Sequence, residues 1–468
     1  MRKETKEYNY DWMMWRIFEA ASRVKDGSEK ESRELLNYIP SFKAALEPMF
    51  SHGEVGTSYL RVVARYLDNI IHAKERGQKT AISTFCFSPA ILYAMDVVPI
   101  TLELLSVMGT ILWKRGTSEY LEYCCEAGFT ETSCSSQRGS LGAYLAGLGV
   151  DIDFVLCDSP GVCDTNANAF AFASTYLDKP FYQLNMPPNL TGERSREYHR
   201  ADFRSMISFI EEQTGKKLDQ DRLREILIEI EVQDEICDEI EELQRLKPNP
   251  APVEYPLFIY ATRFLFSGMK EGTVVLRNIL DKVRENASLG ISGIAGGEEK
   301  VRALFCYIDH YTTNFRMWDM LNDNGVAHLG GILSRQWDIS SPLSREKGDP
   351  EEGYGIRTGS LDEMIDSIAE INSRLPMIKS IRGPYDMPHM WLEDNLALAR
   401  MYDADMIVYS GTPGCRNTWG MIKLFARDTE KQGYPTYIMY SDAFDDRVES
   451  WETTRDRFEE FLKVRRLV

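Results

Sequence analysis

The sequence predicts an α/β protein with two parallel-sheet domains of Rossmann or flavodoxin type, an N-terminal helical region and a helical segment between the sheets. Three observations predict this class. Short apolar runs alternate with helical patterns, as in parallel sheets with crossover helices. The 468 residues exceed the usual size of one core, so two or three domains are expected. Apolar runs that begin at Asp153 and Asp405 both end in a Gly/Pro turn carrying a cysteine, which indicates a diverged duplication of one sheet motif.

The first half is predicted to hold helices followed by a four-stranded sheet. Residues 1–77 form the N-terminal helical region, because aromatic and apolar residues recur near helical spacing and Gly77 follows as a stop. Four apolar runs bounded by turn residues predict buried strands: 80–85, 97–102, 153–158 and 180–186. Helices are predicted after Cys134 and over 164–177. The first α/β domain, with a helical extension, is predicted to span 78–250.

The second α/β domain is predicted over 251–468. Before it, residues 194–246 read as mostly helical, with Asp219 as a helix N-cap, and the proline-rich stretch 247–252 reads as a linker. Four further strands are predicted: 302–309, 325–330, 405–411 and 435–442. Helices are predicted over 264–283, 361–375 and 416–430.

The composition excludes some function classes. The net charge of −18 disfavours nucleic-acid binding, because phosphate backbones bind clustered Lys and Arg. The charged N-terminus lacks the apolar core of a signal peptide, and the longest apolar region, 90–113, is interrupted by charges and a proline. We therefore expect a cytoplasmic protein without a membrane span.

The nine cysteines are expected to be reduced thiols. The sequence contains no Cys-x-x-Cys pair, which argues against a zinc ribbon. Cys157, Cys237 and Cys306 lie within predicted strands or an apolar helix stripe, and are expected to be core residues. Cys124 and Cys125 share a predicted helix, so at most one of them faces a site.

Cys134, Cys163 and Cys415 each begin a predicted helix after a loop. A helix N-terminus lowers a thiol pKa and favours an anionic ligand. An iron–sulfur cluster held by thiolates is such an anion, and three thiolates on a four-iron cluster would leave one iron open to a substrate oxygen. Cys86, at the end of the first strand, is the best substitute ligand. The alternative is two unrelated loops that each carry a cysteine.

Other candidates for chemistry are fewer. His310 follows a predicted strand and is a weak acid–base candidate, with a capping role as the alternative. Ser88 is a weak candidate for a local contact, and His328 is expected to be a core residue. The sequence contains no Gly-x-x-x-x-Gly-Lys-Ser/Thr loop, so ATP hydrolysis by a P-loop is excluded.

Three stretches together resemble the 2-hydroxyacyl-CoA dehydratase and benzoyl-CoA reductase family: Cys134-Ser-Ser-Gln-Arg-Gly-Ser-Leu-Gly-Ala, Phe154-Val-Leu-Cys-Asp-Ser-Pro-Gly-Val-Cys163-Asp and Ser410-Gly-Thr-Pro-Gly-Cys415-Arg. The resemblance covers most of residues 75–468. It implies a [4Fe-4S] cluster held by Cys134, Cys163 and Cys415, as in the cluster-bearing large subunit of such enzymes. Many relatives carry a carboxylate shortly after the proline that follows the first strand, whereas Ala90, Ile91 and Leu92 follow Pro89 here. That departure favours an open, substrate-binding iron.

The resemblance also implies partners and a reaction. A related second subunit would carry its own cluster, and a separate ATP-dependent iron–sulfur activator would supply single electrons. An acyl-CoA thioester would be reduced to a ketyl radical, which makes the 2-hydroxyl a leaving group. Dehydration is the first expectation and ATP-dependent reduction of an aromatic acyl-CoA the second. A non-catalytic electron-transfer or assembly protein and a cluster-free structural protein are the alternatives of other classes.

Overall fold

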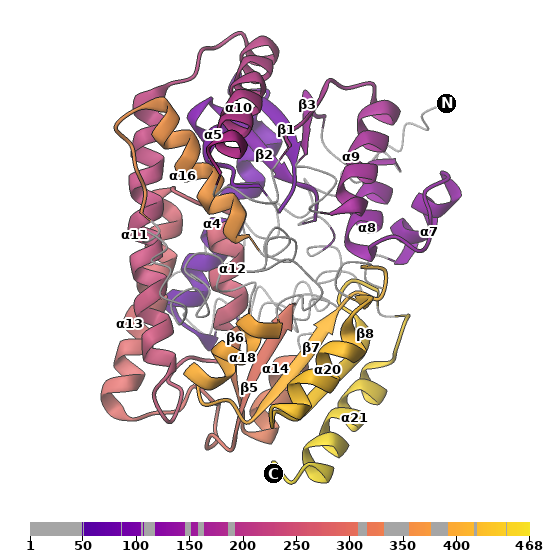
Figure 1. Ribbon diagram of the computed structural model, residues 1–468, viewed down its shortest axis with the longest axis vertical. Helices are drawn as coiled ribbons and strands as arrows, with labels where there is room; N and C mark the ends of the chain where they lie inside the picture. The colour runs from indigo at the N-terminus through magenta and orange to yellow at the C-terminus, as the bar shows by residue number, and fades with distance from the viewer. Residues whose placement is uncertain are drawn as a thin grey trace, which may run out of the picture.

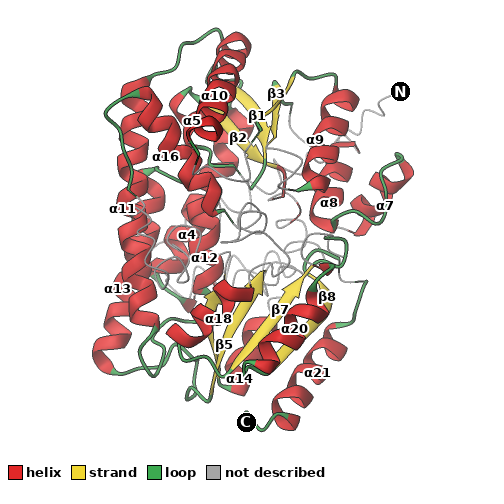
Figure 2. Cartoon of the chain, in the orientation of Figure 1, coloured by secondary structure: helices red, strands yellow, loops and turns green. Residues whose placement is uncertain are grey.

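The computed structural model describes residues 49, 51–85, 87–103, 106, 118–145, 151–157, 163–185, 192–307, 316–331, 355–375, 392–415, 419–445 and 447–468. Two four-stranded parallel sheets organise this part of the chain. The sheets lie at opposite ends of the molecule, with long helices along one side between them (Figures 1 and 2). The predicted α/β class with two parallel sheets is confirmed.

The first sheet has the order β2-β1-β3-β4. Its strands are β1 (Lys79–Ser83), β2 (Val97–Thr101), β3 (Phe154–Cys157) and β4 (Phe181–Gln183). All four predicted strands of this half are confirmed within a few residues. The helices between them are α5 (Ala90–Ala94), α7 (Ser118–Glu126), α8 (Ser135–Leu145) and α9 (Asp164–Leu177).

The second sheet repeats this plan with the order β6-β5-β7-β8. Its strands are β5 (Val301–Tyr307), β6 (Val326–Gly331), β7 (Met406–Gly411) and β8 (Thr436–Asp442). The helices in this half of the sequence are α14 (Arg316–Asn324), α16 (Leu361–Arg374), α18 (Leu392–Met401), α20 (Ile422–Lys431) and α21 (Trp451–Val464). In both sheets the first strand along the chain pairs with the second on one side and the third on the other.

Five helices form the layer beside the sheets: α4 (Glu54–His72), α10 (Glu193–Thr214), α11 (Gln220–Gln244), α12 (Tyr255–Leu265) and α13 (Lys270–Leu289). The predicted N-cap is confirmed, because the Asp219 carboxylate accepts from the Arg222 backbone N–H at 2.9 Å. The helix predicted over 264–283 is wrong in its boundaries. Gly268 interrupts it with φ +71°, a conformation that favours glycine, and a Cβ there would lie 2.5 Å from the Ile226 carbonyl oxygen.

The predicted linker 247–252 connects α11 to α12, and from Asn249 onward it is buried. Asn249 and Ala251 are buried. The Asn249 carbonyl accepts from the Gly293 N–H at 2.7 Å, and its side-chain amide donates to the His328 carbonyl at 3.3 Å. These bonds tie the connection between α11 and α12 to the second sheet.

Helix α16 belongs to the second half of the sequence but packs with the first. Arg200 of α10 pairs with Asp366 at 2.6 Å. Met364, Ile365 and Ile368 share one buried apolar cluster with strands β1 and β3. A helix from the second half of the sequence therefore completes the packing around the first sheet. Among the described helices, none combines the length and the apolar character needed to cross a membrane.

The duplication inferred from the two aspartates has a direct structural counterpart. In the first sheet the Asp153 carboxylate accepts from the Thr80 N–H at 2.9 Å, at the start of β1. In the second, the Asp405 carboxylate accepts from the Arg302 N–H at 2.8 Å, at the start of β5. In each sheet the aspartate just before the third strand therefore caps the backbone of the central strand.

Candidate functional site

Cys134 lies directly before α8 and serves as its N-cap, since its carbonyl accepts from the Arg138 N–H at 3.1 Å. Every residue of α8 is buried, including its polar first turn. The Arg138 guanidinium donates back to the Ser133 carbonyl at 3.0 Å. This fixes the turn that carries the thiol, so the predicted cysteine at a helix start is confirmed for Cys134.

Cys163 is the N-cap of α9, in extended conformation, and its carbonyl accepts from the Ala167 N–H at 3.2 Å. Its link to Cys134 runs through the first turns of the two helices. The Gln137 side-chain amide of α8 donates to the side-chain oxygen of Asn166 in α9. Each of these residues is the third after its cysteine, so the two helix N-termini meet side by side.

Cys415 lies in the turn after β7. Its N–H donates to the Thr412 carbonyl at 2.9 Å, and its carbonyl accepts from the Trp419 N–H at 2.9 Å. Gly414 lies against the Cys134 segment so closely that a Cβ would approach the Ser133 carbonyl oxygen to 2.6 Å. The turn of the second sheet therefore packs on the helix N-terminus of the first half.

The thiol of Cys134 interacts electrostatically with Cys415. Burial raises the pKa of Cys134 well above its usual range, and the charges of Cys415 and Asp442 add to this, against hydrogen bonds from the Gln137 and Ser136 backbone that lower it. The expectation that the helix N-terminus lowers this thiol pKa is therefore wrong, because burial outweighs the helix. A metal that binds such a thiol displaces its proton.

Within the described residues, no three His, Cys, Asp or Glu side chains gather tightly enough to hold a single metal ion. A four-iron cluster makes a different demand, because each thiolate binds its own iron. The donor set suits that group. Cys134, Cys163 and Cys415 all begin helical turns, and the backbone N–H groups of Ser136 and Gln137 point at the Cys134 sulfur.

Tyr307 stands at the same edge and was missed from the sequence. It ends β5 with φ +74°, a conformation that is strained for an aromatic residue. Its hydroxyl lies 4.0 Å from the Cys415 sulfur. Gly411 makes room for it, since a Cβ there would approach the Tyr307 ring to 2.9 Å. A conformation of this kind is set by tertiary packing, and nothing in the sequence signals it.

Glu103 is a second residue that the sequence reasoning missed. It is buried and accepts from the Gln137 amide at 2.6 Å and from the Thr84 hydroxyl at 3.1 Å. The Asn166 amide in turn donates to the Thr84 hydroxyl at 2.5 Å. Burial raises the pKa of Glu103 to about 7. The hydrogen bonds that Glu103 accepts from Gln137, Thr84 and the Phe85 N–H lower this pKa but do not outweigh burial. Its place directly after the predicted strand 97–102 was the available signal.

The other residues predicted from the sequence lie in different environments. The Ser88 N–H donates to the Asn372 side chain at 2.8 Å, and its hydroxyl lies 3.4 Å from the Ala90 N–H, which is a local turn contact. Cys86 and His310 lie outside the described residues. His328 is confirmed as a core residue, stacked on Phe305 with ring centroids 4.0 Å apart. The three cysteines expected in the core are buried: Cys157, Cys237 and Cys306.

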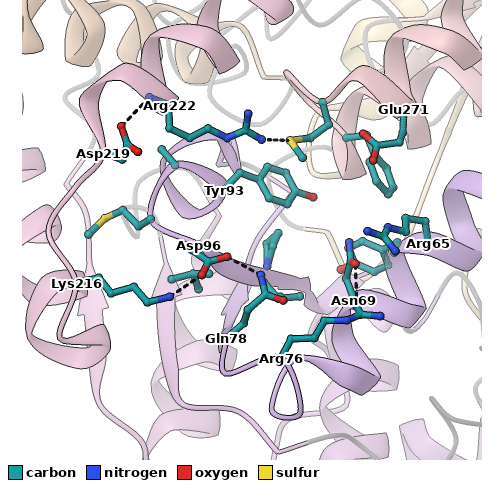
Figure 3. Close-up of a pocket in the computed structure, with 18 of the residues that line it drawn as sticks. Arg65, Asn69, Arg76, Gln78, Tyr93, Asp96, Lys216, Asp219, Arg222 and Glu271 are labelled. Carbon is teal, nitrogen blue, oxygen red and sulfur yellow. Dashed lines mark hydrogen bonds and ion pairs between the residues drawn. The ribbon is translucent and has the colours of Figure 1, made fainter.

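A cavity of about 720 Å³ lies elsewhere, at the amino edge of the first sheet. Figure 3 shows Asp96 between Lys216 and Gln78, with Tyr93 above them in this view. Its cations are engaged by carboxylates: Lys216 pairs with Asp96 at 2.5 Å and Arg76 with Asp68 at 2.7 Å. Open α/β sheets bind their ligands beyond the carboxyl ends of the strands. The cysteine edge is therefore the candidate site.

Comparison with known proteins identifies the family of the chain. A family model described as 2-hydroxyglutaryl-CoA dehydratase, D-component, matches residues 84–464. The chain belongs to this family. It is similar to the (R)-phenyllactyl-CoA dehydratase alpha subunit of Clostridium sporogenes, with 26% identity over 286 residues that cover 57% of this chain and 69% of the relative.

Two further relatives carry related names. The (R)-2-hydroxyisocaproyl-CoA dehydratase alpha subunit of Clostridioides difficile is 24% identical over 59% of this chain and 69% of its own length. The lactoyl-CoA dehydratase subunit alpha of Anaerotignum propionicum is 23% identical over 80% of this chain and 88% of its own length. The matched region contains Cys134, Cys163 and Cys415, and the family expected from their motifs is confirmed.

Proposed function

We propose that this chain is the cluster-bearing, alpha-type subunit of a 2-hydroxyacyl-CoA dehydratase. The observation that carries the proposal is the meeting of the half-buried Cys134 and the buried Cys415 at one edge, in a chain whose residues 84–464 match the family model. Cys134, Cys163 and Cys415 would hold a [4Fe-4S] cluster. Three relatives named as alpha subunits of such dehydratases support the assignment.

The proposed reaction removes water from a 2-hydroxyacyl-CoA. The hydroxyl leaves from C2, a proton leaves from C3, and the double bond of an enoyl-CoA forms between them. When bound, the cluster would supply one electron to the thioester carbonyl, and the electron returns after water has left, so no net redox change occurs. A separate ATP-dependent iron–sulfur activator would inject the first electron, and a related second subunit with its own cluster would complete the enzyme.

The residues of this chain would prepare the site for that chemistry. The three cysteines would bind the group at a dry edge, because Cys163 and Cys415 are 8% and 7% exposed. Glu103 fixes Gln137 and Asn166, and through them the N-termini of α8 and α9. With its pKa raised to about 7 by burial, Glu103 holds or releases a proton near neutral pH.

The test begins with anaerobic purification of the full chain with its partner subunit, followed by iron and sulfide determination. The complex, activator and ATP are then incubated separately with (R)-2-hydroxyisocaproyl-CoA, lactoyl-CoA, phenyllactyl-CoA and benzoyl-CoA, and products are identified by mass spectrometry. We expect enoyl-CoA from at least one of the hydroxyacyl thioesters and no turnover without the activator.

Any other result would overturn the proposed function or replace it with a different one. Reduction of the benzoyl-CoA ring in place of dehydration would assign the chain to the reductase branch. A full cluster with no binding of any CoA ester would indicate an electron-transfer protein. Absence of iron from protein prepared without oxygen would overturn the cluster itself.

A further inference from the structure

Three polar side chains meet where the two halves of the molecule touch, beside the cysteines. Ser135 comes from the first turn of α8, Thr412 from the turn after β7, and Asp442 from the end of β8. The Asp442 carboxylate accepts from the Ser135 hydroxyl at 2.6 Å and from the Thr412 hydroxyl at 2.6 Å, one on each oxygen. The two hydroxyls also lie 3.0 Å apart. All three side chains are buried, at 1%, 1% and 4% exposure, so water does not compete for these bonds.

Burial raises the pKa of the Asp442 carboxyl, and the hydrogen bonds to both of its oxygens oppose this by stabilising the charged form. The Phe444 and Asp445 backbone N–H groups donate to the oxygen that also accepts from Ser135, at 2.8 and 3.1 Å. All four partners are therefore donors, and a carboxylate is an acceptor only. A buried charge is costly unless it is hydrogen-bonded, and here both oxygens are.

Each hydroxyl that binds Asp442 adjoins a proposed ligand. Ser135 is the residue after Cys134, and the Thr412 carbonyl accepts from the Cys415 N–H at 2.9 Å. One carboxylate thus connects the segment of Cys134, in the first half, to the turn of Cys415, in the second. The connection spans 307 residues of sequence between Ser135 and Asp442.

We propose that Asp442 is a positioning residue that holds Cys134 and Cys415 at one spacing before a cluster is inserted, and that its charge keeps the reduction potential of the bound cluster low. The inference rests on the proposed function. Preorganised ligands bind faster and more tightly because less ordering remains to be done. A nearby negative charge disfavours the reduced cluster, which is the more negative state.

Two kinds of variant separate these roles. Asp442→Asn removes the charge and retains the shape, and its amide oxygen can still accept from Ser135 and the backbone. The double variant Ser135→Ala, Thr412→Val removes the two hydroxyls and leaves the Asp442 carboxyl with its two backbone donors. Asp405→Asn, at the far edge of the same sheet, is the control for the charge. Thr273→Val, which breaks a 2.5 Å bond to Glu229 between α11 and α13, is the control for loss of a buried hydroxyl.

Full-length chains are reconstituted without oxygen from iron and sulfide. Cluster insertion is followed by absorbance, and the potential is measured by redox titration monitored by electron paramagnetic resonance. For Asp442→Asn we expect a higher potential, equivalent to about tenfold tighter electron binding, or ~59 mV for one electron. For the double variant we expect slower insertion, by about tenfold, the lower end of the loss in metal affinity that outer-shell changes cause. Both controls should behave as the unaltered chain.

The outcomes distinguish this inference from the proposed function. If the unaltered chain takes up no iron, the proposed function fails and the inference with it. If it takes up a cluster while Asp442→Asn leaves the potential unchanged and the double variant leaves the rate unchanged, only the inference is overturned. Circular dichroism of the cluster-free variants, compared with the two controls, identifies any that have lost the fold. A double variant that folds and inserts iron at the normal rate contradicts the positioning role by itself.

Discussion

In the first sheet, Asp153 caps β1 and the chain continues through β3 to Cys163. In the second, Asp405 caps β5 and the chain continues through β7 to Cys415. The strand orders also correspond. The halves differ in what else they bring to the cysteine edge: α8 with Cys134 comes from the first half, and Tyr307 and Asp442 come from the second. The shared plan therefore places two thiols, and the differences between the halves would complete the site.

The largest expected effect comes from the cysteines themselves. Cys134→Ser, Cys163→Ser and Cys415→Ser should each reduce the iron content of anaerobically purified protein to near zero, because a cluster that loses one of three thiolates loses much of its binding. Iron and sulfide assays measure this. Cys237→Ala, at a buried cysteine of α11, is the control and should retain full iron. Full iron in Cys163→Ser would show that the two sheets do not contribute equivalent ligands.

Gly414→Ala should have the next largest effect, because it disturbs the contact between the turn after β7 and the segment of Cys134. The added Cβ meets the Ser133 carbonyl at 2.6 Å, and overpacking of this kind costs about 1–3 kcal/mol. We expect a lower thermal midpoint and several-fold less iron. Gly192→Ala has nothing within 4 Å of its Cβ and should match the unaltered chain in both measurements. If the two variants behave alike, the close approach of the turn to Cys134 is not required.

Glu103 should make the stability of the first half depend on pH. Its pKa rises from 4.5 to about 7 on folding, so between these values the folded state binds more protons than the unfolded state. The free energy of unfolding should therefore fall as pH rises, by up to about 1.4 kcal/mol per pH unit from this group. Denaturant unfolding of cluster-free protein at pH 5, 6 and 7 measures the slope. Glu103→Gln should remove this component, and an unchanged slope would contradict the raised pKa.

The smallest effects test the duplication itself. Asp153→Asn and Asp405→Asn each weaken one hydrogen bond to the backbone of a central strand, a loss of about 0.5–1.5 kcal/mol. Asp153→Asn also removes a largely exposed ion pair with Lys79, which adds about 0–1 kcal/mol. If the two halves are built on the same plan, the two changes in unfolding free energy should agree within that range. A large cost at one aspartate and none at the other would show that the matched spacing does not reflect a matched role. Iron content should be unaffected in both variants.

Much of the fold could be predicted because each buried parallel strand is a short apolar run of consecutive residues. All eight described strands were predicted within a few residues, as were the N-cap at Asp219 and the helix that follows Cys134. The helix over 264–283 was not, because the need for a turn at Gly268 comes from the Ile226 carbonyl of another helix. The place of each cysteine in a strand, a helix stripe or a turn separated the core cysteines from Cys134, Cys163 and Cys415.

The sequence by itself determined the two sheets, the family and the three cysteines at the starts of helical turns, since each depends on residues close together along the chain. Only the tertiary structure decided the surroundings of those thiols. Burial raised the pKa of Cys134 against the pull of its helix, and Asp442 reached Ser135 from 307 residues away. Desolvation and contacts between distant segments depend on how the whole chain packs, so neither can be predicted from a short stretch of sequence.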